Sequence, residues 1–167
     1  MKRPVQILLM MLALGVQSEH AQSRSQRTIS ETKVKLDATR EAKRDSAVFP
    51  SHTLTEGVDY ERLRGRALTE TIAGTNIAPT IPSGAVAHQL FEIDGRYVLS
   101  SDHAFEAWGG YFVTNDMVAT WIKVSNSYSR VSNFALYQSQ SGKFMLAWLG
   151  RNQAPEFAEI RIDRKDR

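Results

Sequence analysis

The sequence predicts a mainly β fold of the α+β class, in which an antiparallel meander forms a small barrel or a strongly curved sheet. One segment, residues 59–73, has helical spacing of its apolar side chains, whereas beyond about residue 88 apolar residues recur with a period of two. Tight-turn sequences such as Asp94-Gly95 and Asn115-Asp116 separate the runs of period two. Short strands joined by such turns are typical of antiparallel hairpins, and one N-terminal helix packed on them completes the domain.

Residues 59–73 form the helix that the spacing predicts. Gly74 stands where a C′ glycine would end it. Gly65 within the run costs about 1 kcal/mol relative to alanine, so the helix needs tertiary packing to persist. The apolar side that would pack consists of Tyr60, Leu63, Ala67, Leu68 and Ile72.

The meander that follows contains short strands separated by turns. Turns are predicted at Asp94-Gly95, Gly109-Gly110, Asn115-Asp116 and residues 139–143, and a polar loop at residues 125–132. The predicted strands are residues 88–93, 96–100, 104–108, 111–114, 117–124, 134–138, 144–149 and 156–162. A run of strands of this kind favours a small barrel or a curved sheet.

Two of these strands are apolar on both faces. Residues 117–124 and 144–149 do not alternate between apolar and polar side chains, as a sheet wetted on one face would. An apolar surface must therefore cover their second face. We expect the helix at residues 59–73 to do so; a ligand or a partner subunit is the competing explanation.

The first residues have the layout of a secretory signal peptide. Lys2 and Arg3 precede the apolar run Val5–Val16, and small or polar residues follow. The run is about a dozen residues long, whereas a membrane-spanning helix needs about 20, so no transmembrane anchor is predicted. We assign residues 1–21 to the signal, with cleavage between Ser18 and Ala21, and expect a periplasmic or secreted bacterial protein.

Residues 22–49 are interpreted as a charged, disordered spacer before a single β-rich domain at residues 50–167. The segment has few apolar side chains and many charges of both signs, so it could bury little surface. A frayed, exposed helix over residues 30–44 and electrostatic adhesion to anionic lipid are the alternatives. Acidic residues interleave with the basic ones along the segment, which argues against adhesion.

Composition excludes several classes of function. The 167-residue chain has no cysteine, so disulfides, thiol catalysis and thiolate metal sites are absent. Its net charge of +3 comes from the first 49 residues, because from Pro50 onward 12 Lys and Arg face 13 Asp and Glu. The domain has no basic face for nucleic acid, so no nucleic-acid partner is predicted.

A set of turn and strand motifs resembles a known group of proteins. Residues 68–75 end a helix on a Gly-Thr step, residues 91–97 (FEIDGRY) form a hairpin, and residues 110–118 continue the meander as GYFV…DMV. Together they resemble small exported bacterial β-meander domains of unknown function, over about residues 60–150. The resemblance implies the fold and export, and it implies no activity.

No catalytic, metal or cofactor site emerges from the residue pattern. Ser101-Asp102-His103 is contiguous, whereas the members of a nucleophilic triad must converge in space. Zinc needs three or four ligands, and of the histidines only His88 and His103 lie in the expected folded region. The sequence therefore predicts no enzyme and no cofactor.

Two binding hypotheses remain, with a hydrolytic enzyme as a less favoured third. The first is a non-enzymatic module that binds a protein or an envelope polymer; the alternative is a lipocalin-like carrier of a small apolar ligand. The carrier's cavity would be lined by Trp108, Tyr111, Trp121, Tyr137 and Trp148.

The candidate binding site of the first hypothesis lies around the expected Gly109-Gly110 turn. Aromatic residues and arginine at a rim favour recognition of a partner. The proposed residues are Trp108 and Tyr111, joined by His103, Tyr128 and Arg130.

Overall fold

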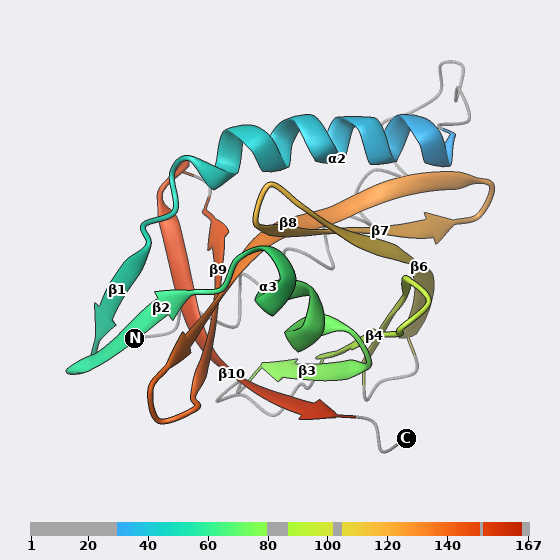
Figure 1. Ribbon diagram of the computed structural model, residues 1–167. Helices are drawn as coiled ribbons and strands as arrows, with labels where there is room; N and C mark the ends of the chain where they lie inside the picture. The colour runs from blue at the N-terminus through green and yellow to red at the C-terminus, as the bar shows by residue number, and fades with distance from the viewer. Residues whose placement is uncertain (1–29, 80–86, 102–104, 151, 165–167) are drawn as a thin grey trace.

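The computed structural model describes residues 30–79, 87–101, 105–150 and 152–164. The predicted signal at residues 1–21 and the candidate residue His103 lie outside the described residues. Two helices and ten strands are described (Figure 1). The helices are α2 (Glu31–Ser46) and α3 (Gly65–Ile72). The strands are β1 (His52–Thr55), β2 (Val58–Arg62), β3 (Thr75–Pro79), β4 (Ala87–Phe91), β5 (Arg96–Ser101), β6 (Phe105–Thr114), β7 (Met117–Val124), β8 (Ser127–Ser139), β9 (Phe144–Leu149) and β10 (Pro155–Arg164).

Eight of the strands close into an antiparallel barrel. Their order is β8-β7-β6-β5-β4-β3-β10-β9, and pairing of β9 with β8 completes the circle. The long strand β8 makes closure possible, because Ser127–Phe134 pairs with β7 while Ala135–Gln138 pairs with β9. The hairpin β1–β2 continues from the barrel wall, since Tyr60–Arg62 pairs with the end of β8. The barrel and the antiparallel meander predicted from the sequence are confirmed.

Apolar side chains from all eight barrel strands fill the interior. Helix α3 adds Leu68 and Ile72, both fully buried, to the same cluster. Phe91 lies at its centre, with ring centroids 5.1 Å from those of Tyr97 and Tyr111. The strand residues of this interior cluster are Ile77, Phe91, Tyr97, Leu99, Ala107, Tyr111, Val118, Ile122, Phe134, Leu136, Leu146 and Ile160.

The predicted helix at residues 59–73 is wrong in its first half. Val58–Arg62 is strand β2, and only Gly65–Ile72 is helical. In β2 the side chains of Tyr60 and Arg62 are buried and those of Asp59 and Glu61 are exposed, which is the period of a strand. A long-range contact fixes the start of α3, because the Asp116 carboxylate accepts a hydrogen bond of 2.9 Å from the Gly65 N–H.

The interpretation of residues 22–49 as a disordered spacer is corrected for the part that the structure describes. Helix α2 runs along the outside of the barrel over β7 and β8 (Figure 1). The Ser30 side chain caps it by accepting from the Lys33 N–H at 3.3 Å. Val34, Ala38 and Ala42, spaced four residues apart, are buried. Small alanine side chains let the helix approach the sheet closely, so a segment of low mean hydropathy still packs.

The same helix covers the second apolar face of the barrel wall. The predicted cover is therefore present, but its assignment to residues 59–73 is wrong: α2 and the β1–β2 hairpin supply it, whereas α3 joins the interior cluster. The outer cluster beneath α2 consists of Ala42, Phe49, Tyr60, Met117, Ala135, Tyr137, Met145 and Ala147.

Arg62 is buried where α2 ends and joins it to the barrel. One terminal nitrogen, Nη1, donates to the carbonyl oxygens of Ser46 at 2.9 Å and Phe49 at 3.2 Å. The other, Nη2, donates to the Asp116 carbonyl at 3.0 Å and the Ser46 hydroxyl at 2.9 Å. Burial lowers the pKa of Arg62. The side chain thus satisfies carbonyl groups after α2 and in the β6–β7 turn at once.

Two further local predictions are corrected. Gly109-Gly110 is not a turn but lies within β6, and most of the predicted loop 125–132 belongs to β8. A side chain at Gly110 would collide with the Trp121 indole, because an added Cβ would lie 2.3 Å from its Cζ2 atom. The glycine pair therefore serves close packing, which local sequence cannot distinguish from a turn.

Candidate functional site

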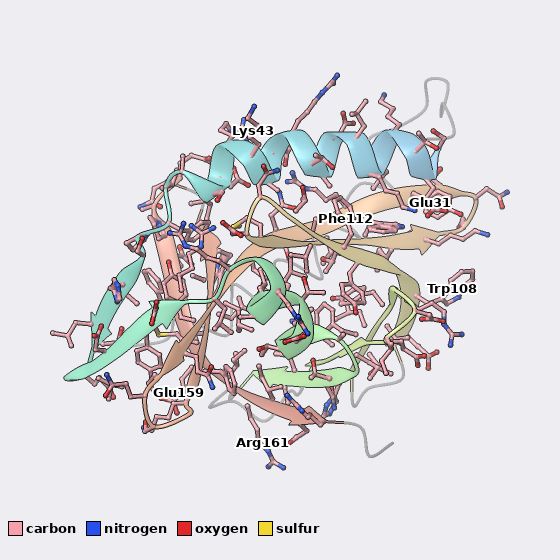
Figure 2. All side chains as sticks on the ribbon, viewed as in Figure 1. Glu31, Lys43, Trp108, Phe112, Glu159 and Arg161 are labelled. Carbon is pink, nitrogen blue, oxygen red and sulfur yellow. The ribbon has the colours of Figure 1, made fainter. Side chains whose placement is uncertain are left out.

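A groove of about 400 Å³ opens between the first turns of α2, the β4–β5 turn and the outer side of β6–β8. We call it the aromatic groove. Figure 2 shows Glu31, Phe112 and Trp108 at the same end of the molecule. Its lining consists of Glu31, Lys35, Asp94, Gly95, Arg96, Trp108, Gly109, Gly110, Tyr111, Phe112, Trp121 and Tyr128.

The floor of the groove is built on Trp121. Its ring lies against Gly110 of the neighbouring strand and is almost fully buried. The Phe112 ring packs beside it, with centroids 5.6 Å apart, and the Lys35 ammonium of α2 lies 4.9 Å from the indole centroid. A cation over an indole face is attracted by its quadrupole, so α2 is held to the floor at this point.

Trp108 forms the exposed rim. Its side chain projects from β6 and is 58% exposed, which is unusual for a tryptophan. The Lys123 ammonium on β7 lies 5.3 Å from the Trp108 ring centroid. Tyr128 is the register partner of Lys123 on β8. Cross-strand pairing therefore places an indole, an ammonium and a phenol in a row on one face of the sheet.

Ion pairs flank the groove on two sides. On α2, Lys35 and Glu31 form an ion pair at 2.6 Å. On the β4–β5 turn, Arg96 contacts Glu92 and Asp94, each at 2.8 Å. Charges of both signs are thus within reach of a ligand, and the groove has no strong net charge.

Tyr111 has a mainly structural part in this site. Its hydroxyl donates to the Glu92 carbonyl at 2.7 Å, and its ring packs edge-on against Phe91 in the interior cluster. Burial, with a smaller contribution from Asp94, raises the pKa of Tyr111. The hydroxyl therefore stays protonated at neutral pH and holds the β4–β5 turn against β6.

The five candidate residues separate into three groups. Trp108, Tyr111 and Tyr128 all line the aromatic groove. Arg130 does not: it lies beside α2 and forms an ion pair with Glu41. Partial burial lowers the pKa of Arg130, while Asp37 opposes the shift. His103 lies outside the described residues.

Sequence reasoning did not place Lys35, Arg96 or Trp121 in the candidate site. Lys35 belongs to the segment interpreted as a spacer, and Arg96 was read only as a strand residue following a turn. Trp121 lies on the face opposite the interior residue Ile122, which is the face that forms the groove floor. Only the pairing of β6 with β7 brings it over Gly110.

The aromatic residues expected to line one internal cavity are divided between the two sides of the barrel wall. Tyr111 and Trp148 contact the interior cluster. Tyr137 belongs to the outer cluster under α2, and Trp108 and Trp121 belong to the aromatic groove.

A second hollow, of about 720 Å³, lies beside the β1–β2 hairpin. Its lining is almost entirely polar or charged and includes His52, Asp59, Glu61 and Arg64. His52 is the register partner of Glu61, so those two side chains share a face of the hairpin. Arg64 contacts Ser51 and Asp116, which gives it a structural part.

Stacking and hydrogen bonding are the chemistry that the aromatic groove offers. Among the residues that the structure describes, no group of three or more His, Asp or Glu side chains could hold a metal ion. No described helix is both long and apolar enough to cross a lipid bilayer. Comparisons with known protein families, with curated proteins and with solved structures found no match to this chain.

Proposed function

We propose that this protein is an exported, non-enzymatic binding module of the bacterial envelope and that the aromatic groove is its ligand-binding surface. The observation that carries the proposal is the exposed indole of Trp108 at the rim of a concave hollow. A volume of about 400 Å³ falls in the usual range of small-ligand sites, about 300–1,000 Å³. The hollow therefore suits one or a few rings of a ligand better than a broad, flat protein surface.

The ligand class that fits this lining is an envelope polysaccharide. An indole face packs against the apolar face of a sugar ring, whose hydroxyl groups lie at the ring's edge. The charged groups of Lys35, Glu31 and Arg96 line the groove and can donate to or accept from such hydroxyls. Because these charges are balanced, they favour a neutral ligand over a strongly charged one.

A lipocalin-like carrier is the alternative, and the closed eight-stranded barrel is compatible with it. A carrier needs space inside the barrel for its apolar ligand. Here Leu68 and Ile72 of α3 and Phe91 of β4 are fully buried in that interior. A ligand would have to displace them, so the groove supports binding more directly than the interior does.

Replacing Trp108 by alanine should abolish most binding while leaving the fold intact. Soluble oligomers of N-acetylglucosamine serve as the probe, and titration is followed by tryptophan fluorescence and calorimetry. Removal of an aromatic side chain that dominates binding typically costs at least about 2 kcal/mol, so Kd should rise about 30-fold or more. The free energy of unfolding should change by less than about 1 kcal/mol, because the ring is mostly exposed.

Leu54→Ala is the matched control, since Leu54 is another exposed apolar side chain, on β1 and outside the groove. It should bind the oligomers as the wild type does. Equal binding by Trp108→Ala and the wild type would refute the proposal that the aromatic groove is the binding site. Binding of a fluorescent fatty acid that Trp108→Ala leaves unchanged would favour the carrier instead.

Export is tested by the N-terminus of the protein from its own cells. Edman or mass-spectrometric sequencing of the periplasmic or secreted fraction should begin between Glu19 and Gln22, because the apolar run Val5–Val16 is expected to be removed with the signal. A cytoplasmic protein that retains Met1 would contradict this expectation.

A further inference from the structure

Packing of α2 sorts its charges onto two sides. Two of the four acidic residues of α2 turn toward the barrel: Glu41 forms an ion pair with Arg130, and Asp45 accepts from the Asn133 amide at 3.3 Å. The basic residues on the opposite side project into solvent, and Figure 2 shows Lys43 pointing away from the barrel. Glu41 and Asp45 are therefore separated in space from most of the outward cations, although Asp45 also pairs with Arg44 at 3.5 Å.

The exposed fractions of the side chains confirm this separation. Those of Arg40 and Arg44 are 71% and 70%, against 34% for Glu41 and 12% for Asp45. Asp37, at 48%, is more exposed, but it stands beside Arg40 at 4.0 Å. The outward stripe at spacings of three, four and seven residues consists of Lys33, Leu36, Arg40, Lys43 and Arg44. We call it the basic face.

Exposed apolar side chains accompany these cations. Leu36 lies within the basic face and is 49% exposed. Val48, just beyond the end of α2, is 45% exposed. Clustered cations attract anionic headgroups, and apolar side chains among them can enter the boundary between headgroups and acyl chains.

We propose that the basic face docks the protein on the surface of a membrane that contains anionic phospholipid. The interleaved acids argue against such adhesion in the sequence, and the structure reduces that objection because Glu41 and Asp45 turn toward the barrel and Glu31 pairs with Lys35 at the groove. Leu36 and Val48 favour a lipid surface over nucleic acid, because phosphate–cation contacts alone would gain nothing from exposed apolar side chains. The proposal is independent of the aromatic groove, whose lining includes none of the basic face.

The test measures binding to vesicles by co-sedimentation. The wild type should bind vesicles of phosphatidylglycerol mixed with phosphatidylcholine, should bind pure phosphatidylcholine weakly, and should be released by added salt. Each Lys or Arg near an anionic surface contributes about fivefold in affinity, so Lys33→Gln/Arg40→Gln/Lys43→Gln should lower the partition constant by roughly 100-fold. All three side chains are exposed, so the thermal midpoint should not move.

Two control variants separate the position of the charge from its total. Arg66→Gln/Lys143→Gln/Arg161→Gln removes the same net charge from exposed sites outside α2; Arg161 lies on the opposite side of the molecule from α2 (Figure 2). It should bind within a few-fold of the wild type. Lys33→Arg/Arg40→Lys/Lys43→Arg keeps the charge of the basic face and should bind normally.

Three outcomes would overturn the proposal. The first is equal binding of the wild type to anionic and neutral vesicles. The second is an equal loss of binding by both charge-removing variants, which would show that net charge alone decides. The third is binding of a DNA duplex that depends on Lys33, Arg40 and Lys43 while vesicles are ignored, which would assign the basic face to nucleic acid.

Discussion

Replacement of Arg62 by methionine is expected to lower the free energy of unfolding by about 3–5 kcal/mol, because several hydrogen bonds to a buried charged group are lost together. Methionine keeps much of the side-chain volume but donates nothing. The carbonyl oxygens of Ser46, Phe49 and Asp116 would each lose the donor that Arg62 supplies. Chemical denaturation followed by tryptophan fluorescence measures the change.

Two further variants show whether the guanidinium fork is the cause. Arg62→Lys keeps the charge, but a single ammonium cannot reach both the end of α2 and the β6–β7 turn, so roughly half of the loss should remain. Arg64→Met removes a neighbouring, half-exposed arginine and should cost less than about 1 kcal/mol. If Arg62→Met unfolds at the same denaturant concentration as Arg64→Met, Arg62 does not join α2 to the barrel.

The strands were predictable from sequence because their signals are local. Period-two patterns and the turns at Asp94-Gly95 and Asn115-Asp116 identified β4, β5 and β7 with small errors at the ends, whereas β6 was divided in two by a turn wrongly predicted at Gly109-Gly110. Strand β2 was missed because Tyr60 and Leu63 satisfy the i, i+3 spacing of a helix, whereas the residue that is buried with Tyr60 in the strand is the charged Arg62. Only the pairing of Tyr60 with Ser139 and the Asp116 contact at Gly65 decide between helix and strand, and both are distant in sequence.

A helix over residues 30–44 was one alternative for this segment, but its packing on the barrel as α2 was missed for an energetic reason. Its buried side chains Val34, Ala38 and Ala42 are few and small, so a count of apolar residues gave the segment no means to offset its ordering entropy. The missing stabilisation comes from the partner surface: Met117, Ala135 and Ala147 on the barrel were already apolar and needed a cover. The apolar second face of β7 and β9 indicated that another segment covers it, but it did not indicate which segment.

The candidate site was predictable in part, because the signals for its strands are local. Trp108 and Tyr128 come together through strand pairing across β7, which a meander implies. Arg130 is only two residues from Tyr128, yet it pairs with Glu41 of α2 and does not line the groove. Once α2 was taken for a spacer, the residues that contact α2 could not be distinguished from those that line the groove.

The second large effect on stability is expected at the floor of the aromatic groove. Trp121→Ala should lower the free energy of unfolding by about 3–5 kcal/mol, because a buried indole is lost and a cavity remains. Gly110→Ala should cost about 3 kcal/mol, at the upper end for overpacking, since the new methyl would lie 2.3 Å from the Trp121 ring. The backbone of Gly110 is not in the left-handed region, so alanine is otherwise acceptable there.

The double variant Gly110→Ala/Trp121→Ala shows whether the two single substitutions destabilise the protein through one shared steric contact or independently of each other. With the indole gone, the added methyl has room and fills part of the cavity, so the two costs should not add. We expect the double variant to be at least about 1 kcal/mol more stable than the sum of the single losses predicts. Denaturant unfolding of the four proteins measures this coupling. Additive losses would mean that the Trp121 ring does not lie on Gly110, and the groove would then lack the floor that holds Trp108 at its rim.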